Sequence, residues 1–259
     1  MSNEKPKSEL YGGVHGMDSW ERIQRVVQEN NIPLRDVLES FAIYTRRINV
    51  TRFLAHYELY RMIAQLPGSI VECGVYQGNS FFAFHKFLEI FHPGDRIRHV
   101  IGFDDFKGLR LSEEDGPEYA NRSKVEGGWK SLGFKAALDD LMKIQTDDQF
   151  VPASKRSFLI EGDILETVPK YVKDNPGVRI SLLHLDVDVY EPTKVALDHF
   201  YDRVVPGGLI VLDEYAMMEW GGESKAVEDF FKERDYPVPE FKTFSWTSTP
   251  SAYFFKNHF

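Results

Sequence analysis

Two patterns of apolar residues divide the chain near residue 67. Before it, apolar side chains recur three and four positions apart, as in Leu34, Leu38 and Phe41, which is typical of amphipathic helices. After it, short apolar runs alternate with helical stretches, which indicates βαβ units and a parallel sheet. We therefore expect a helical cap over residues 1–66 and an α/β core over residues 67–259 that form one structural unit.

The second pattern predicts a doubly wound, Rossmann-like sheet. Strands are expected near residues 69–75, 98–104, 157–161, 179–186 and 208–213. Helices are expected near residues 79–91, 131–144, 192–203 and 223–234. Residues 242–247 and 251–256 alternate like strands around a Ser-Thr-Pro turn, so they predict a closing antiparallel hairpin.

Composition narrows the classes of partner. The formal net charge of −9 argues against a nucleic-acid partner and an anionic membrane surface, because phosphate binding needs clustered Lys and Arg side chains. Cys73 is the one cysteine, which excludes an internal disulfide and suits a reducing compartment. No apolar run approaches the roughly 20 residues of a membrane helix, and the N-terminus lacks the apolar stretch of a signal peptide. We expect a cytoplasmic protein with a small-molecule partner.

Two apolar runs end in acidic pairs. Asp186 and Asp188 follow the run that begins at residue 179, and Asp213 and Glu214 follow the run that begins at residue 208. Strand side chains alternate between faces, so Asp186 and Asp188 are expected to point the same way. Open α/β sheets bind their ligands at the carboxyl ends of the strands. If the two strands are neighbours, four carboxylates converge there.

Such a cluster has two chemical interpretations. Oxygen ligands without histidine or cysteine suit Mg²⁺, Mn²⁺ or Ca²⁺ better than zinc, and crowded carboxylates repel unless a cation or a proton joins them. An ion that also bound a substrate hydroxyl would lower the pKa of that hydroxyl. The alternative is that these are ordinary strand-end acids that cap the following turns.

The first expected strand leads into a glycine-bearing turn. Glu72, Gly74 and Gly78 precede a helix that starts near Ser80. Such a turn lets the backbone approach a ligand closely, with the amides of the helix N-terminus facing it. A carboxylate at the strand end suits a cationic, hydroxyl-bearing ligand such as S-adenosylmethionine better than a pyrophosphate. An ordinary βα turn with a capping acid remains the alternative.

Two further strand ends carry acids suited to an adenosyl group. Asp104 closes the second strand, where ribose-binding acids lie in nucleotide folds. Asp163 follows the third strand, where a carboxylate could accept a hydrogen bond from the adenine amino group. Either residue could instead cap the turn in which it lies.

Five blocks of residues, taken in order, resemble the macrocin O-methyltransferase family. They are residues 71–80 (VECGVYQGNS), 102–109 (GFDDFKGL), 185–193 (LDVDVYEPT), 206–215 (PGGLIVLDEY) and 225–230 (KAVEDF). Five ordered blocks are far more specific than any one of them. The resemblance covers roughly residues 45–235 and implies an S-adenosylmethionine- and Mg²⁺-dependent enzyme that methylates a sugar hydroxyl of an antibiotic or related glycoside.

The resemblance also implies roles for individual residues. Asp186, Asp213 and Glu214 would hold the metal ion, although the family usually has Asp at the position of Glu214. Asp188 would be the general base or a further metal contact.

For the cofactor, the resemblance implies that Glu72, Gly74 and Gly78 line the S-adenosylmethionine site and that Asp104 binds the ribose. Residues 1–44 and the polar 107–130 loop match the family poorly, so they are expected to recognise the acceptor.

Several alternatives stay open. His184 could assist the base or be a hydrogen-bonded core residue, and Arg46 and Arg47 could reach over the pocket. A nicotinamide-dependent dehydrogenase, a catechol or phenol O-methyltransferase and a non-catalytic binding subunit are the competing functions. Exposed helical faces near the N-terminus predict a homo-oligomer.

Overall fold

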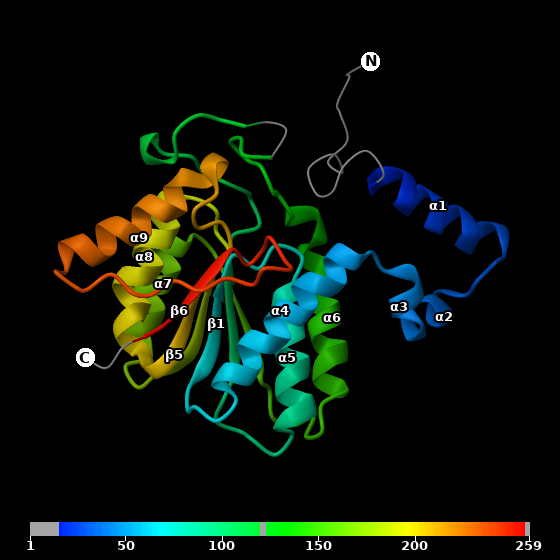
Figure 1. Cartoon of the computed structure of the whole chain (residues 1–259). Coiled ribbons are helices and arrows are strands. Elements are labelled where there is room, and N and C mark those ends of the chain that lie inside the picture. Colours follow the sequence, from blue (N-terminus) through cyan, green and yellow to red (C-terminus); the bar gives the residue numbers. More distant parts are fainter. Residues whose placement is uncertain (1–15, 120–122, 257–259) are drawn as a thin grey trace.

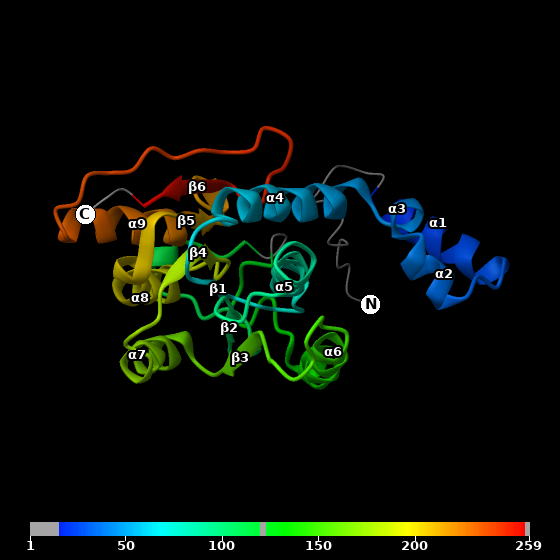
Figure 2. The same ribbon diagram turned by 90° about the horizontal axis from the view of Figure 1, so that it is seen from below.

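The N-terminal part of the chain is helical, as its periodicity predicts. The computed structural model describes residues 16–119 and 123–256, so residues 1–15 of the expected cap lie outside the described part. The first helices are α1 (Gly16–Glu29), α2 (Leu34–Glu39), α3 (Phe41–Tyr44) and α4 (Arg47–Ile63). Helices α1 to α3 extend to one side of the molecule, whereas α4 lies over the sheet (Figures 1 and 2).

One six-stranded sheet forms the core, with the strand order β3-β2-β1-β4-β5-β6. The strands are β1 (Ser69–Cys73), β2 (Val100–Asp104), β3 (Ser157–Glu161), β4 (Ile180–Leu185), β5 (Val204–Leu212) and β6 (Ala252–Phe255). The first five pair in parallel, and β6 pairs antiparallel to β5. The order reverses between β1 and β4, which is where doubly wound sheets bind ligands. The expected Rossmann-like α/β fold is confirmed.

Helices cover both faces of this sheet (Figure 1). They are α5 (Asn79–Phe91), α6 (Lys135–Asp147), α7 (Ile164–Asp174), α8 (Tyr190–Phe200) and α9 (Gly221–Glu233). Helices α4 to α6 lie on one face and α7 to α9 on the other. Sequence patterning did not predict α7. This helix contains Pro169 in its interior, and a proline in a sequence usually indicates the end of a helix.

The alternation of β4 distributes its residues between two apolar clusters. Leu183 and Leu185 pack with Phe200 and other residues of α7 to α9, whereas Leu182 packs with residues of α4 and α5. His184 shares the α4 face with Leu182, because side chains two positions apart point the same way. A polar side chain is thus buried beneath α4.

The expected hairpin at the C-terminus is not what forms. Strand β6 pairs with β5, and of the preceding segment only Lys242 forms a single bridge, to Tyr253. Strand β5 would otherwise expose its backbone N–H and C=O groups at the edge of the sheet, and β6 satisfies them.

Two expectations concern the surface of the molecule. Leu34 and Ile43 in the short N-terminal helices are 71% and 75% exposed, which agrees with a face available for self-association, although a homo-oligomer stays a prediction. Within the described residues, every helix is too short or too polar to span a bilayer.

We predict that Phe200→Ala lowers the free energy of unfolding by about 3–5 kcal/mol, because it leaves a cavity where α8 packs on the sheet. Phe200 is fully buried, and its ring centroid lies 5.5 Å from that of Phe103. Denaturation in urea measures the loss. The matched control is Phe150→Ala, at a side chain that is 73% exposed, which should change stability by less than about 0.5 kcal/mol. Equal losses in the two variants would contradict this packing.

Candidate functional site

A cavity of about 1060 Å³ opens at the carboxyl ends of the strands. Its walls come from the β1–α5 turn and from the ends of β2, β4 and β5. Phe41 and Asn49 from the N-terminal segment also line it, as do Leu109 and Trp129 from the loop after β2. The two segments expected to recognise an acceptor therefore both border the cavity.

Glycines shape the β1–α5 turn at one wall. Gly74 has a φ of +90°, and a Cβ atom there would lie 1.8 Å from the backbone oxygen of Asp186. Gly78 has a φ of +84° and precedes α5, where Ser80 is buried and lines the cavity. All three predicted residues of this turn thus border the cavity, and Gly74 allows β1 to approach the end of β4.

Asp104 lines the cavity at the end of β2 and fixes the shape of the same turn. Its Oδ2 accepts hydrogen bonds from the backbone N–H groups of Val75 (2.8 Å) and Tyr76 (2.7 Å), and its Oδ1 accepts one from Phe106 (2.6 Å). Burial raises the pKa of Asp104, although these three hydrogen bonds oppose the shift.

Asp163 lies at the cavity wall, where it has a neighbour that sequence patterning did not predict. Its Oδ1 caps helix α7 by accepting a hydrogen bond from the Leu165 N–H at 2.9 Å. Its Oδ2 accepts one from Arg110, which also donates to Asp105. Arg110 belongs to the loop after β2 and thus links two acids at this end of the cavity.

Glu72 does not border the cavity, in contrast to the expectation of a direct cofactor contact. It is fully buried in the middle of the sheet, and its Oε1 pairs with Nδ1 of His184 at 2.9 Å. The reason is alternation, because Glu72 points to the α4 face, where His184 is its neighbour on β4. Glu72 thus contacts His184 beneath α4 instead of lining the cavity.

The four carboxylates predicted to follow the strands β4 and β5 converge at the cavity, beside the glycine turn. Asp186, Asp188, Asp213 and Glu214 all line the cavity. The strand register explains this, because Leu185 pairs with Leu212, and the Asp213 N–H donates to the Leu185 oxygen at 3.1 Å. The carboxyl ends of these neighbouring parallel strands therefore deliver their acids to one place.

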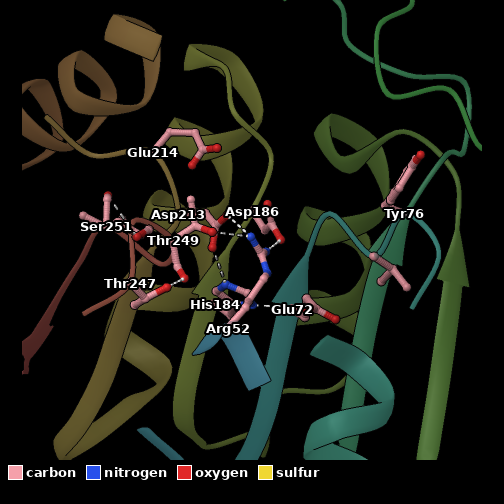
Figure 3. Close-up of polar contacts among 12 residues, drawn as sticks. Arg52, Glu72, Tyr76, His184, Asp186, Asp213, Glu214, Thr247, Thr249 and Ser251 are labelled. Atoms are coloured by element: carbon pink, nitrogen blue, oxygen red, sulfur yellow. Dashed lines mark hydrogen bonds and ion pairs between the residues drawn. The ribbon is translucent and has the colours of Figure 1, made fainter. Parts of the chain in front are cut away.

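An arginine from α4 joins two of these acids (Figure 3). Nη2 of Arg52 donates to Asp186 Oδ2 at 2.6 Å, and Nη1 donates to Asp213 Oδ2 at 2.8 Å. The same Nη1 donates to Thr249 Oγ1 at 2.8 Å. A guanidinium thus lies between the acids expected to hold a metal ion.

The predicted metal ligands Asp186, Asp213 and Glu214 line one cavity, but they do not form a group whose ligand atoms all lie within 4.8 Å of one another. Within the described residues, Glu72, His184 and Asp186 are the group whose potential ligand atoms all lie within 4.8 Å of one another. Asp213 and Glu214 are outside that group, and Figure 3 shows the Glu214 side chain apart from the Arg52 ion pairs.

Asp188 lies at the cavity because of a turn, and not because strand side chains alternate between faces as the sequence led us to expect. Strand β4 ends at Leu185, and Asp188 has a φ of +65° within a tight turn, where the Val189 N–H donates to the Val187 oxygen at 2.8 Å. Non-glycine residues rarely adopt this conformation, and where they do it is often at a functional site.

Glu223 in α9 adds a buried acid that sequence patterning did not single out. Its Oε1 accepts a hydrogen bond from the Glu214 N–H at 3.2 Å, and its side chain is fully buried. Oε2 of Glu214 and Oε2 of Glu223 are both buried without a hydrogen-bond partner among the described residues. Burial and the charge of Asp213 raise the pKa of both carboxyls.

Asp186, Asp213 and His184 are neighbours, but burial and nearby charges shift their pKa values in different directions. Burial and the charge of Asp213 raise the pKa of Asp186 to about 7, whereas the Arg52 and His184 charges hold the pKa of Asp213 below its usual range despite burial. Burial lowers the pKa of His184, but its hydrogen bonds to Asp213 and Glu72 outweigh burial and raise that pKa to about 10. His184 is thus a buried core residue that is hydrogen-bonded on both ring nitrogens, at 2.9 Å from Glu72 Oε1 and 3.4 Å from Asp213 Oδ1.

Sequence patterning missed Arg52, although a signal for it was present. Arg52 lies three and four residues before Ala55 and His56 on the buried face of α4, so it is a charged residue in an apolar stripe. Neither of the arginines considered as pocket residues lines the cavity, and Arg46 instead lies over the Trp20 ring at 5.9 Å.

Comparison with known proteins agrees with this architecture. Residues 54–249 match the family model described as Macrocin-O-methyltransferase (TylF). A Streptomyces olivaceus protein named 8-demethyl-8-(2,3-dimethoxy-alpha-L-rhamnosyl)-tetracenomycin-C 4'-O-methyltransferase is 28% identical over 166 residues, which cover 59% of this chain. The match spans 54% of that relative, or about half its length.

Two solved structures of CalS11 resemble the whole chain. One, described as a calicheamicin methyltransferase, has a TM-score of 0.85 at 25% identity and covers 98% of both chains. The other, described as a TDP-rhamnose 3'-O-methyltransferase, has a TM-score of 0.77 at 26% identity and covers 95% of this chain and 96% of its own. Because the family model matches well over half of the residues, this chain belongs to the macrocin O-methyltransferase family.

Proposed function

We propose that this protein is an S-adenosylmethionine- and divalent-metal-dependent O-methyltransferase that acts on a hydroxyl of a sugar or glycosylated natural product. One observation carries the proposal. A single cavity joins the glycine turn after β1, Asp104 and Asp163 with the four carboxylates that follow β4 and β5. At about 1060 Å³ it lies at the upper end of the range for ligand sites, which suits two ligands side by side.

The methyl donor is proposed to bind along the β1–α5 turn. Gly74, Gly78 and Ser80 bring backbone and the start of α5 to the cavity. A carboxylate has about four lone-pair sites, so Asp104 retains one for a ribose hydroxyl after accepting three backbone N–H groups. Asp163 is proposed to accept from the adenine amino group.

Asp186, Asp213 and Glu214 are the proposed holders of the divalent ion. The donor set is all carboxylate oxygen, and Oε2 of Glu214 is buried without a partner among the described residues, so these residues fit a hard cation. When bound, such an ion would lower the pKa of a substrate hydroxyl.

Asp188 is the proposed general base. The methyl group leaves the sulfonium sulfur and bonds to the acceptor oxygen, while the hydroxyl proton passes to the Asp188 carboxylate. The products are S-adenosylhomocysteine and a methyl ether. Burial and the charge of Asp186 raise the pKa of Asp188, which makes it a stronger base than an exposed carboxylate.

The class of acceptor is inferred from relatives. The S. olivaceus protein is named for methylation of a rhamnosyl group, and CalS11 is described as acting on TDP-rhamnose. A deoxysugar, carried either on a nucleotide or on a glycoside, is therefore the proposed acceptor. A catechol or phenol acceptor and a non-catalytic role are the alternatives.

Asp188→Asn is expected to lower turnover by about 10²–10⁴-fold, because it removes the proton acceptor. Asparagine tolerates a positive φ, so the turn should survive and S-adenosylhomocysteine affinity should change by less than about threefold. Steady-state kinetics and calorimetry measure the two quantities. Turnover within about twofold of wild type would exclude Asp188 as the base.

Chelation is expected to remove activity reversibly. Dialysis against EDTA should lower turnover by at least about 100-fold, and added Mg²⁺ or Mn²⁺ should restore it. The same additions should not restore Asp186→Ala, because the ion would lack a ligand. Full turnover in excess chelator would refute the metal requirement, but it would not contradict the proposed methyl transfer.

Screening of acceptors separates the proposed substrate from its alternatives. Mass spectrometry should detect a gain of one methyl group on a TDP-deoxysugar or a deoxysugar glycoside, and none on catechol. Methylation of catechol alone would favour the phenolic alternative. Failure to bind S-adenosylmethionine by calorimetry, with intact folding, would favour a non-catalytic subunit.

A further inference from the structure

Arg52 occupies a site built for a guanidinium. It lies on the face of α4 that also carries the buried residues His56 and Leu59. Three acceptors lie within 2.8 Å of its Nη atoms: Asp186 Oδ2, Asp213 Oδ2 and Thr249 Oγ1. Asp186 directly follows β4, Asp213 directly follows β5, and Thr249 lies in the segment before β6. Arg52 therefore links helix α4 to the carboxyl ends of β4 and β5 (Figure 3).

The oxygens that Arg52 holds belong to the proposed ligands of the divalent ion. An ion such as Mg²⁺ binds oxygens at about 2.1 Å, so adjacent ligand oxygens lie about 3 Å apart. In this structure Asp213 and Glu214 are outside the group of ligand atoms that lie within 4.8 Å of one another. The guanidinium therefore occupies the Asp186 and Asp213 oxygens that the proposed ion would need.

We propose that Arg52 and the divalent ion compete for the Asp186 and Asp213 carboxylates, so that Arg52 is the internal cation of the ion-free protein. The proposal rests on the metal site of the proposed function. It also links ion binding to helix α4, because release of Arg52 removes the ion pairs that fasten this helix to β4 and β5.

Two observations favour competition over coexistence. A guanidinium and a divalent cation on the same two carboxylates repel each other, because they are like charges at short separation. The Arg52 side chain is 25% exposed and lines the cavity, whereas Asp213 is 2% exposed. Arg52 can therefore withdraw into the cavity without disturbing the strand that carries Asp213.

A different role for Arg52 would give the opposite result. Hydrogen bonds from outer residues often orient the carboxylates that bind a metal, and their removal weakens metal affinity by about 10–100-fold. If Arg52 acted in that way, its replacement would weaken ion binding rather than strengthen it.

The test is the affinity of the protein for Mn²⁺ alone, measured by calorimetry and by the electron paramagnetic resonance signal of free Mn²⁺. Arg52→Met keeps most of the side-chain length and removes the charge, so it should bind Mn²⁺ at least about tenfold more tightly than wild type. Arg52→Lys keeps a charge without the two-pronged geometry, so its affinity should fall between the two.

Arg61→Met is the matched control, because Arg61 is an exposed arginine of the same helix that pairs only with Glu58 at 3.6 Å among the ion pairs described. It should bind Mn²⁺ as wild type does. S-adenosylhomocysteine binding and thermal unfolding check that each variant is folded, and if Arg52→Met does not fold, Arg52→Lys must still bind more tightly than wild type.

Equal or weaker Mn²⁺ binding by the Arg52 variants would overturn the competition while leaving the metal site in place. Absence of Mn²⁺ binding from wild type and both Arg52 variants would overturn the metal site as well.

Discussion

The repulsion among buried carboxylates at the ends of β4 and β5 is the constraint on which the rest of the structure depends. Asp186 and Asp213 are brought together by strand register, and their side chains are 22% and 2% exposed. Like charges in such a place must be compensated by cations or neutralised by protons. Arg52 and His184 supply that compensation. The N-terminal helix that carries Arg52 is therefore part of the site and does more than cover it.

Sheet register also fixes the relation between the two halves of the cavity. The Asp186 N–H donates to the Cys73 oxygen at 2.9 Å, and Gly74 passes so close to Asp186 that no side chain would fit. The glycine turn proposed to hold the methyl donor thus lies directly beside Asp186, one of the acids proposed to hold the divalent ion. Glu72 and His184 connect the same two strands beneath α4. Positioning of the reacting groups is accordingly a property of the β1–β4 pairing.

The predictable features were those set by local pattern. The apolar runs that end in acids predicted the strands. They also placed Asp186 and Asp213 at the ligand-binding edge of the sheet, because neighbouring parallel strands have their carboxyl ends on the same side. The unpredicted features depend on tertiary packing. Asp188 leaves the strand at a turn, so alternation does not describe it, and Glu72 is covered by a helix whose placement no local pattern specifies. Arg52 contacts Asp186 across 134 positions of sequence, a distance that periodicity does not bridge.

The central claim is that one pair of carboxylates requires a cation, supplied by Arg52 in the absence of metal and by a divalent ion in its presence. The most direct measurement is a crystal structure with Mn²⁺ and S-adenosylhomocysteine, using anomalous scattering at the manganese edge. The account predicts an anomalous peak bound by Asp186 and Asp213, with the Arg52 guanidinium no longer hydrogen-bonded to both. A map without a peak at these acids, or a bound ion with both Arg52 ion pairs intact, would contradict it.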